Sequence, residues 1–250
     1  MSPAGWVPFS ESFSLGEFHV HVYRVRLTVT PERAARLRLA LSPTERDRAD
    51  RFRFRRDRSA WIVSRAALRW VLAQYTGVPS HDLSFREGQY GKPFLDPGCG
   101  GAWLQFNLSH SGELALIALT VGHEVGVDVE RIRPDVNVVA LAHSVFSERE
   151  IARLTTLSPD QQTEMFFNGW TRKEAFIKAV GEGISFGLDR VEVSLAPGEP
   201  TALLMVDREG YQAEDWSMMA LEPGPGYKSA LAVKGNGWVL RCFDLPKDFC

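Results

Sequence analysis

The sequence predicts an α+β fold made of two similar α/β halves. Segments that alternate apolar and polar residues, as strands do, lie between segments whose apolar residues recur at helical spacing. A weak internal echo suggests that the halves are related, although Ala/Leu-rich helices can also resemble each other by chance. The echo pairs residues 42–46 with 147–150, and residues 114–117 with 230–233. A chain of 250 residues can form one large domain or two small ones, and we predict halves at residues 1–124 and 125–250.

In the first half, Val20, Val22 and Val25 alternate with polar residues and predict a strand. Thr30 and Ser42 are typical N-cap residues, so helices are expected after them. The elements expected in this half are a strand at 18–29, helices at 31–41, 44–54 and 57–75, strands at 83–86, 106–108 and 114–120, and a turn at 91–93.

The second half opens with a strand in which valines alternate with acids, and its longest helix is expected to end at Gly181. The elements expected in this half are a strand at 125–130, helices at 138–142, 148–155 and 159–180, and strands at 191–195, 201–206, 217–221, 229–233 and 238–243.

Composition narrows the classes of function. A net charge of -2 argues against bulk binding of nucleic acid, although residues 46–58 are rich in arginine and either form a solvated helix face or meet an anionic ligand or acidic partner. Three cysteines without C-x-x-C spacing indicate neither a disulfide framework nor a zinc site. The first 14 residues lack a secretion signal, and no apolar run is long enough to span a bilayer. We therefore expect a reduced, cytoplasmic protein that does not insert into membranes.

Two acids share one face of the strand expected at 125–130. Strand side chains alternate between faces, so Asp128 and Glu130 point the same way. Adjacent carboxylates on a strand of buried type are costly unless something positive neutralises them. A hard divalent cation would do so and leave room for phosphate oxygens. The alternative is an ordinary half-exposed strand with solvated acids.

A third acid and two lysines occupy the helix expected at 159–180. Trp170, Glu174 and Lys178 recur every fourth residue and so stack on one helix face, with Lys173 beside them. Alone, this pattern could be a surface helix with one ion pair worth ~0.3–0.5 kcal/mol. Together with the paired acids, it indicates a magnesium site that handles a phosphate compound.

Four segments of the chain, in the same order, resemble the motifs of the 4′-phosphopantetheinyl transferase family. The family carries a G-K-P turn, F-N-[IL]-S-H-S, a G-[IV]-D-[IV]-E strand and a W-x-x-K-E-[AS]-x-x-K helix. The matching segments here are Gly91-Lys92-Pro93, Phe106-Asn107-Leu108-Ser109-His110-Ser111, Gly126-Val127-Asp128-Val129-Glu130 and residues 170–178. The resemblance covers about residues 41–227 and is to the longer, single-chain, Sfp-like type that activates synthases.

The resemblance implies a fold and an activity. The two halves would be related by a pseudo-twofold, with the active site in the cleft between them. The enzyme would transfer the 4′-phosphopantetheine of coenzyme A to a serine of an acyl or peptidyl carrier protein and release 3′,5′-ADP. Its partners would be the carrier domains of polyketide, nonribosomal-peptide or fatty-acid-type synthases. A monomer is expected, because an internally duplicated fold already supplies a two-sided cleft.

The resemblance also assigns site residues, with Mg²⁺ as cofactor and coenzyme A as co-substrate. The catalytic residues would be Glu174, as base for the serine proton, Lys178, on the leaving phosphate, and His110. The expected ligands are Asp128, Glu130 and Glu174 for the metal; Ser109, His110, Lys173 and Lys178 for the coenzyme A phosphates; and Arg65 and Lys92 for its adenosine 3′-phosphate end.

The carrier protein is expected to dock near the start of the motif helix. Met165, Phe166 and Phe167 would offer an apolar contact there, unless they belong to the core, and Arg149 or Arg172 could steer an acidic partner. Two other classes of function stay open. A magnesium-dependent phosphohydrolase would use the same acids to activate water. A non-catalytic module that binds coenzyme A or a carrier protein would not need Glu174 and Lys178 together.

Overall fold

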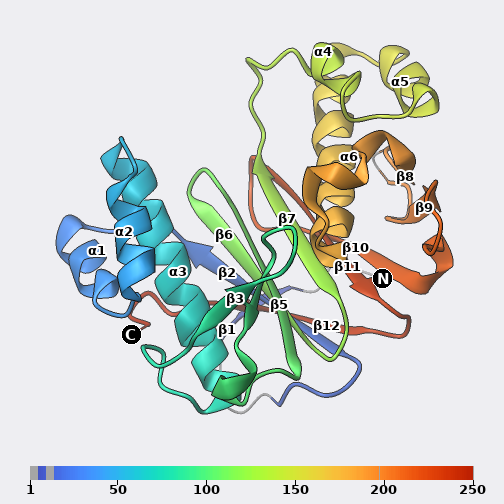
Figure 1. Cartoon of the computed structure of the whole chain (residues 1–250). Coiled ribbons are helices and arrows are strands. Elements are labelled where there is room, and N and C mark those ends of the chain that lie inside the picture. Colours follow the sequence, from blue (N-terminus) through green and yellow to red (C-terminus); the bar gives the residue numbers. More distant parts are fainter. Residues whose placement is uncertain (1–4, 10–13, 197, 250) are drawn as a thin grey trace.

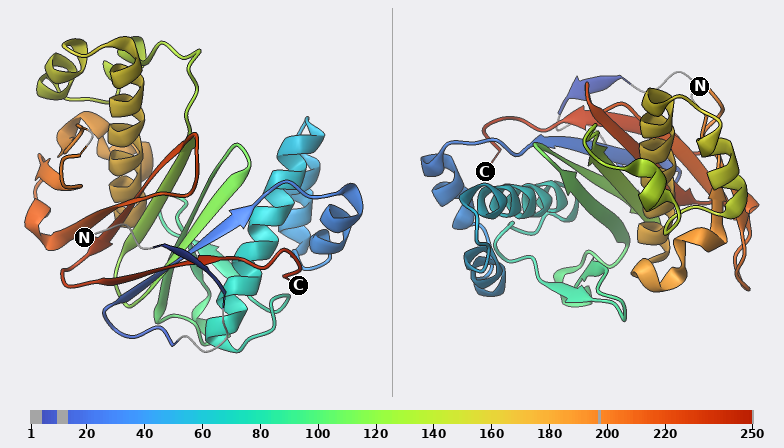
Figure 2. Two further views of the ribbon diagram at one scale, coloured as in Figure 1. Left: turned by 180° about the vertical axis from the view of Figure 1, so that it is seen from behind. Right: turned by 90° about the horizontal axis from the view of Figure 1, so that it is seen from above.

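Two β-sheets pack face to face, and a 22-residue helix covers the outer face of each (Figure 1). The computed structural model describes residues 5–9, 14–196 and 198–249. Helix α3 (Arg55–Thr76) lies on one side of the sheets and helix α6 (Pro159–Val180) on the other, as the view from above in Figure 2 shows. The predicted mixture of helices and sheets is confirmed.

The larger sheet contains strands from both ends of the chain. Among the described residues it has five strands, in the order β1 (Trp6–Pro8), β12 (Val239–Asp244), β2 (His19–Arg26), β6 (Leu114–Val121) and β5 (Leu104–Ser111). Strand β12 pairs in parallel with β1 and β2, while β2, β6 and β5 are antiparallel. The last strand of the chain therefore lies in the sheet of the first half. The division at residue 124 stays a prediction.

The smaller sheet is antiparallel. Its described strands run in the order β10 (Trp216–Leu221), β11 (Tyr227–Lys234) and β7 (Val125–Arg131). Its free edge strand, β7, lies beside β5, the edge strand of the larger sheet (Figure 1). The two sheets thus meet where the two motif strands meet.

The alternation of side chains sorts the core into three layers. In β7, Val125, Val127 and Val129 face the larger sheet, so Gly126, Asp128 and Glu130 face α6. In β6, odd-numbered residues face α3 and even-numbered ones face the smaller sheet. Because one layer covers each face of β7, the side chains of Asp128 and Glu130 point toward α6.

The remaining α-helices and strands are shorter than α3 and α6. They are the helices α1 (Pro31–Arg38), α2 (Pro43–Asp50), α4 (Val138–Ala142) and α5 (Glu148–Thr155), and the strands β3 (Phe85–Glu87), β4 (Pro93–Leu95), β8 (Val191–Val193) and β9 (Leu203–Val206). No helix in the described part of the chain has the length and apolar character to cross a membrane.

Most expected elements are present, with differences at their ends. Helices α4, α5 and α6 have the predicted bounds, whereas β5 is longer than expected and includes the whole F-N-L-S-H-S motif. The prediction of β5 was too short because its polar residues interrupt the apolar pattern that indicates a strand. Strands β1 and β4 were not predicted, because three residues are too few for a periodic pattern.

Candidate active site

Helix α6 lies directly on strand β7 because residue 126 is glycine. A Cβ atom placed on Gly126 would lie 2.1 Å from the carbonyl oxygen of Ala175 and 2.3 Å from the amide nitrogen of Ala179. No side chain fits at that distance, so the backbones of helix and strand touch. This contact brings Glu174 and Lys178 of the helix over Asp128 and Glu130 of the strand.

Asp128 is buried and has one satisfied and one unsatisfied oxygen. Its side chain is 3% exposed. Oδ1 accepts a hydrogen bond of 2.8 Å from the Ser109 hydroxyl and an ion-pair hydrogen bond from the Lys178 ammonium. Oδ2 is buried and has no hydrogen-bond partner among the residues that the structure describes. A buried carboxylate oxygen of this kind is costly and suits an additional cation or donor.

The other two acids repel each other and Asp128. Burial raises the pKa of Glu130, and Asp128 adds to this against the hydrogen bond from Ser111. Burial also raises the pKa of Glu174, with Asp128 and Glu130 adding to it against Lys178. Burial alone would lower the pKa of Lys178, but the three acids raise it above its ordinary value. The Lys178 ammonium therefore stays charged, but its single positive charge does not neutralise the three nearby carboxyl groups.

The donor set fits a hard divalent cation. As their side chains lie, no three His, Cys, Asp or Glu residues of the described chain form a group that could hold a metal ion. The chemistry nevertheless suits such an ion. The site offers carboxylate oxygens, of which Asp128 Oδ2 is unpartnered, and a bound cation would lower the raised pKa values of Glu130 and Glu174. Asp128, Glu130 and Glu174 are the residues that could hold it.

The opposite face of β5 opens into a second, basic pocket. His110 alternates with Ser109 along the strand and so points away from Asp128, into a pocket that α2, α3 and the β3–β4 hairpin surround. Partial desolvation and the nearby Lys178 lower the pKa of His110, although its side chain is exposed at the pocket surface. The pocket also contains Arg48, whose guanidinium lies 4.5 Å from the Trp61 ring centre, and Arg51. Its charge suits an anionic ligand.

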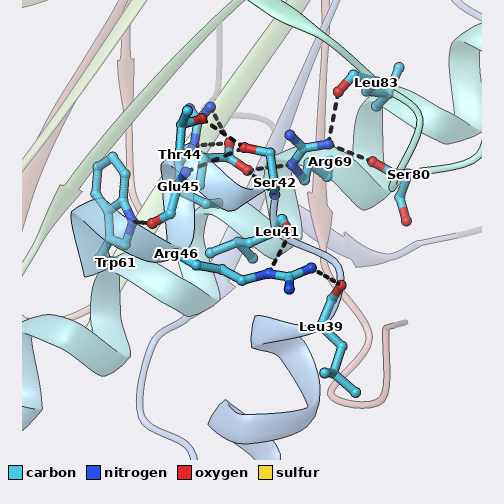
Figure 3. A network of polar contacts seen from close by, with 11 residues as sticks. Leu39, Leu41, Ser42, Thr44, Glu45, Arg46, Trp61, Arg69, Ser80 and Leu83 are labelled. Carbon is cyan, nitrogen blue, oxygen red and sulfur yellow. Dashed lines mark hydrogen bonds and ion pairs between the residues drawn. The ribbon is translucent and has the colours of Figure 1, made fainter. Parts of the chain in front are cut away.

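Arg65 lines this pocket, but its charge is engaged. Its Nε and Nη2 donate to Glu45 Oε1 at 2.9 and 2.7 Å. Arg69 donates to the other oxygen of Glu45 at 2.7 Å, as Figure 3 shows. Glu45 also completes a capping box with Ser42 at the start of α2. Arg65 thus fastens α3 to α2. Among the described arginines that line this pocket, Arg48 and Arg51 form no ion pair and are available to a ligand. Arg48 lies in the last turn of α2 and Arg51 is its C-cap, so their i, i+3 spacing was the available signal.

Lys173 does not lie in the site, which corrects the prediction that it contacts phosphate. Its side chain is 0% exposed, and Nζ donates to Glu150 at 2.5 Å and to the carbonyls of Val145 and Leu188 at 2.9 and 3.0 Å. All three hydrogens of the ammonium are used. Although residue 173 precedes Glu174 in the sequence, its side chain is bonded to Glu150 of α5 and not to the acids of β7.

Lys92 is also placed differently from the prediction. Its Nζ donates to the carbonyls of Ala179 and Val125 at 2.7 and 3.2 Å. A lysine on the last carbonyls of a helix is a C-terminal cap, here for α6. Lys92 lies in a different pocket from Arg65 and His110, so the structure does not bring it to their end of the site.

The predicted apolar docking patch is wrong. Met165, Phe166 and Phe167 are 1%, 3% and 2% exposed and belong to the core under α6. Arg172 is buried as well and bonds to Ser194 and Thr201. Arg149 is exposed, as a steering residue would have to be.

Comparison with known proteins covers both halves of the chain. A model of the 4′-phosphopantetheinyl transferase superfamily matches residues 124–227, and a model of the 4′-phosphopantetheinyl transferase N-terminal region matches residues 30–121. The chain is 36% identical over 233 residues to the 4′-phosphopantetheinyl transferase HetI of Nostoc sp., a match that covers 93% of this chain and 95% of that one. It is 29% identical over 193 residues to the 4′-phosphopantetheinyl transferase Sfp of Bacillus subtilis, with 77% and 82% covered.

Proposed function

The chain belongs to the 4′-phosphopantetheinyl transferase superfamily, and from that premise we infer where its reaction takes place. It is a transferase that moves the 4′-phosphopantetheine arm of coenzyme A to a carrier protein. A serine hydroxyl of the carrier attacks the β-phosphate of coenzyme A, the new phosphodiester forms there, and 3′,5′-ADP leaves. The reaction requires a base for the serine proton and positive charge on the phosphates.

We propose that the acids between β7 and α6 form the reacting centre. The observation that carries this assignment is Asp128, whose one oxygen is held by Ser109 and Lys178 while the other is buried and unpartnered. Asp128, Glu130 and Glu174 would hold Mg²⁺, which neutralises the pyrophosphate charge when bound.

The helix supplies the residues that handle protons and charge. Glu174 accepts the serine proton as the general base. Lys178 stays charged beside Asp128 and stabilises the phosphate that leaves. Both residues project from the same face of α6, one turn apart.

The basic pocket on the other side of β5 would receive the adenosine 3′-phosphate. His110, Arg48 and Arg51 line it and can donate hydrogen bonds to phosphate oxygens. Coenzyme A would then cross β5, with its nucleotide in this pocket and its pyrophosphate near Ser109. Arg65 shapes the pocket through Glu45.

We further propose that the active site lies between two halves related by a pseudo-twofold. A repeated clamp supports this relationship: Glu45 of α2 and Glu150 of α5 each complete a capping box with a serine. Each of these glutamates then binds basic side chains of the following 22-residue helix, namely Arg65 and Arg69 on α3, and Lys173 on α6. Duplication of one unit would produce such a repeat.

We propose that the protein is a cytoplasmic monomer. Its partners would be the carrier domains of polyketide, nonribosomal-peptide or fatty-acid-type synthases. The decisive experiment is mass spectrometry of an apo carrier protein incubated with the chain, coenzyme A and Mg²⁺. A phosphopantetheine adduct on the carrier serine, absent with Asp128→Asn, is expected. Hydrolysis of coenzyme A without an adduct would instead favour a phosphohydrolase. Binding of coenzyme A with neither product would favour a non-catalytic module.

A further inference from the structure

Three side chains of β5 form hydrogen bonds to the backbone of β7, where paired strands would have a ladder of backbone hydrogen bonds. Asn107 Oδ1, Ser109 Oγ and Ser111 Oγ accept hydrogen bonds from the backbone N–H groups of Val127, Val129 and Arg131, at 2.9, 3.4 and 3.1 Å. We call these three β5 residues the seam. Both strands have a period of two, so every second side chain of β5 meets every second N–H of β7. The seam supplies acceptors for N–H groups on the edge of β7, while β5 and β7 remain in separate sheets.

Two members of the seam also hold the acids. Ser109 donates its hydroxyl hydrogen to Asp128 Oδ1 at 2.8 Å, and Ser111 donates to Glu130 Oε2 at 2.6 Å. Each serine thus accepts from the backbone just after an acid and donates to the acid itself. A hydroxyl has one hydrogen, so the backbone N–H orients it toward the carboxylate. The spacing of the two acids is therefore set by the spacing of two serines on another strand.

We propose that Ser111 is a positioning residue for Glu130, which it holds by one oxygen so that the other is free for a cation. This inference rests on the proposed function. The Ser109 hydroxyl has a further partner in Lys178, so its removal would disturb two groups. The Ser111 hydroxyl bonds only Glu130 and Arg131 N–H among the described residues. The role of Ser111 can be measured separately.

The physical effect is pre-organisation. Glutamate has three rotatable side-chain bonds, and Glu130 is only partly buried at the end of the valine-lined part of β7, so its carboxylate would otherwise sample several positions. A hydrogen bond from a neutral donor to a charged carboxylate is strong and restrains one oxygen. A metal ion then binds without ordering the side chain first.

The test compares three variants of the full chain. Ser111→Ala removes the hydroxyl, Ser111→Thr keeps it, and Ser217→Ala is the matched control. Ser217 also lies on a strand and donates to a backbone carbonyl, that of Gly235 at 2.7 Å, but in the outer strand β10. Two readouts are needed: the affinity for Mn²⁺, as a probe metal, measured by calorimetry with coenzyme A present and no carrier, and the Mg²⁺ concentration that gives half-maximal transfer.

The expected result is a loss of metal affinity of about 10-fold in Ser111→Ala, in line with the effect of residues that orient metal ligands. The half-maximal Mg²⁺ concentration should rise by a similar factor, while kcat at saturating Mg²⁺ falls by less than about 3-fold. Ser111→Thr should regain most of the affinity, and Ser217→Ala should match the parent. If Ser111→Ala does not fold, Ser111→Cys, which is close in size but a weak donor, takes its place.

Parental metal affinity in Ser111→Ala would overturn the inference, and so would equal losses in Ser111→Ala and Ser111→Thr. A further check uses Glu130→Gln: if Ser111 acts through Glu130, adding Ser111→Ala to that variant should change metal affinity by less than about 2-fold. Failure of the parent chain to modify any carrier protein would instead contradict the proposed function. The two failures are thus distinguishable.

Discussion

Gly126 of β7 and Ala175 of α6 are in backbone contact, and a Cβ atom on residue 126 would lie 2.1 Å from the Ala175 carbonyl oxygen. The acids of the strand and the charged residues of the helix lie on the two elements that this contact joins. The glycine of the G-V-D-V-E segment is therefore needed for close approach of the helix. Its φ value is not in the left-handed region, so turn geometry does not explain it.

We predict that Gly126→Ala destabilises the protein and impairs transfer. The methyl group must push α6 away from β7, and overpacking of this kind costs about 1–3 kcal/mol or more. Urea denaturation should show this loss, and kcat should fall because Glu174 and Lys178 move away from Asp128. Gly88→Ala is the control, since its Cβ would have only an ordinary 3.5 Å contact with the Lys92 carbonyl oxygen. Parental stability in Gly126→Ala would contradict the close contact.

Asp128→Asn should abolish most of the transfer while it preserves the fold. The amide has the shape of the carboxylate but no charge, so it neither holds a cation well nor pairs with Lys178. We expect kcat to fall by ~10²–10³, as for other single electrostatic groups of active sites. Steady-state kinetics with an apo carrier protein measure this. Glu124→Gln, which alters an exposed ion pair with Lys234, should leave kcat unchanged.

Lys173→Met should affect stability and not the use of coenzyme A. The substitution leaves Glu150 buried without its cation, which typically costs about 3–5 kcal/mol. Replacing both partners, as in Lys173→Met with Glu150→Leu, should recover only part of this loss, because Glu150 also accepts hydrogen bonds from the backbone N–H groups of Ser147 and Val193. Urea denaturation of both variants tests the expectation. A raised KM for coenzyme A in folded Lys173→Met would return this lysine to the phosphate site.

Arg48→Ala should raise KM for coenzyme A by about 10-fold. The side chain lies on the Trp61 ring in the basic pocket, and a charge-assisted hydrogen bond to phosphate is worth about 1.5–3 kcal/mol. The matched control is Arg46→Ala, two residues away on the same helix. Arg46 donates to the carbonyls of Leu41 and Leu39 outside the pocket (Figure 3). Equal KM values for the two variants would place the 3′-phosphate elsewhere.

Stability should fall with pH because of the buried His21. Burial, with His19 and Arg241 adding to it, lowers the pKa of His21 from 6.5 to about 4. Between these values the unfolded chain binds a proton that the folded chain does not, so the stabilising effect is complete above pH 6.5 and is lost as the pH falls toward 4. The loss amounts to about 3 kcal/mol for a shift of this size.

His21→Asn provides the comparison for this pH dependence. Asparagine can still form a hydrogen bond with the Tyr75 hydroxyl, which lies 2.7 Å from His21 Nδ1, but it does not titrate. Urea denaturation of both proteins between pH 4 and 8 should show a smaller pH dependence for the variant. Parallel curves would mean that His21 takes up its proton in the folded protein as well.

Much of the fold could be predicted where a pattern is local and long. Helices α5 and α6 begin after serine caps and keep helical spacing, and their bounds match the prediction. The sequence pattern of β12 also indicates a strand. Its pairing with β2, which lies more than 200 residues earlier, cannot be predicted from the sequence of either segment. The lengths of short edge strands such as β1 were beyond the reach of periodicity.

The sequence by itself determined which side chains share a face. Period two put Asp128 and Glu130 together, and a helical spacing of four put Glu174 with Lys178, as the structure has them. Only the tertiary structure decided what covers each face. Lys173 and Arg65 carry the charges of phosphate ligands, yet Glu150 and Glu45 from other helices bind them. Ser111 holds Glu130 through contacts between two sheets. Such pairings depend on how separate elements pack, and local periodicity contains no information on that.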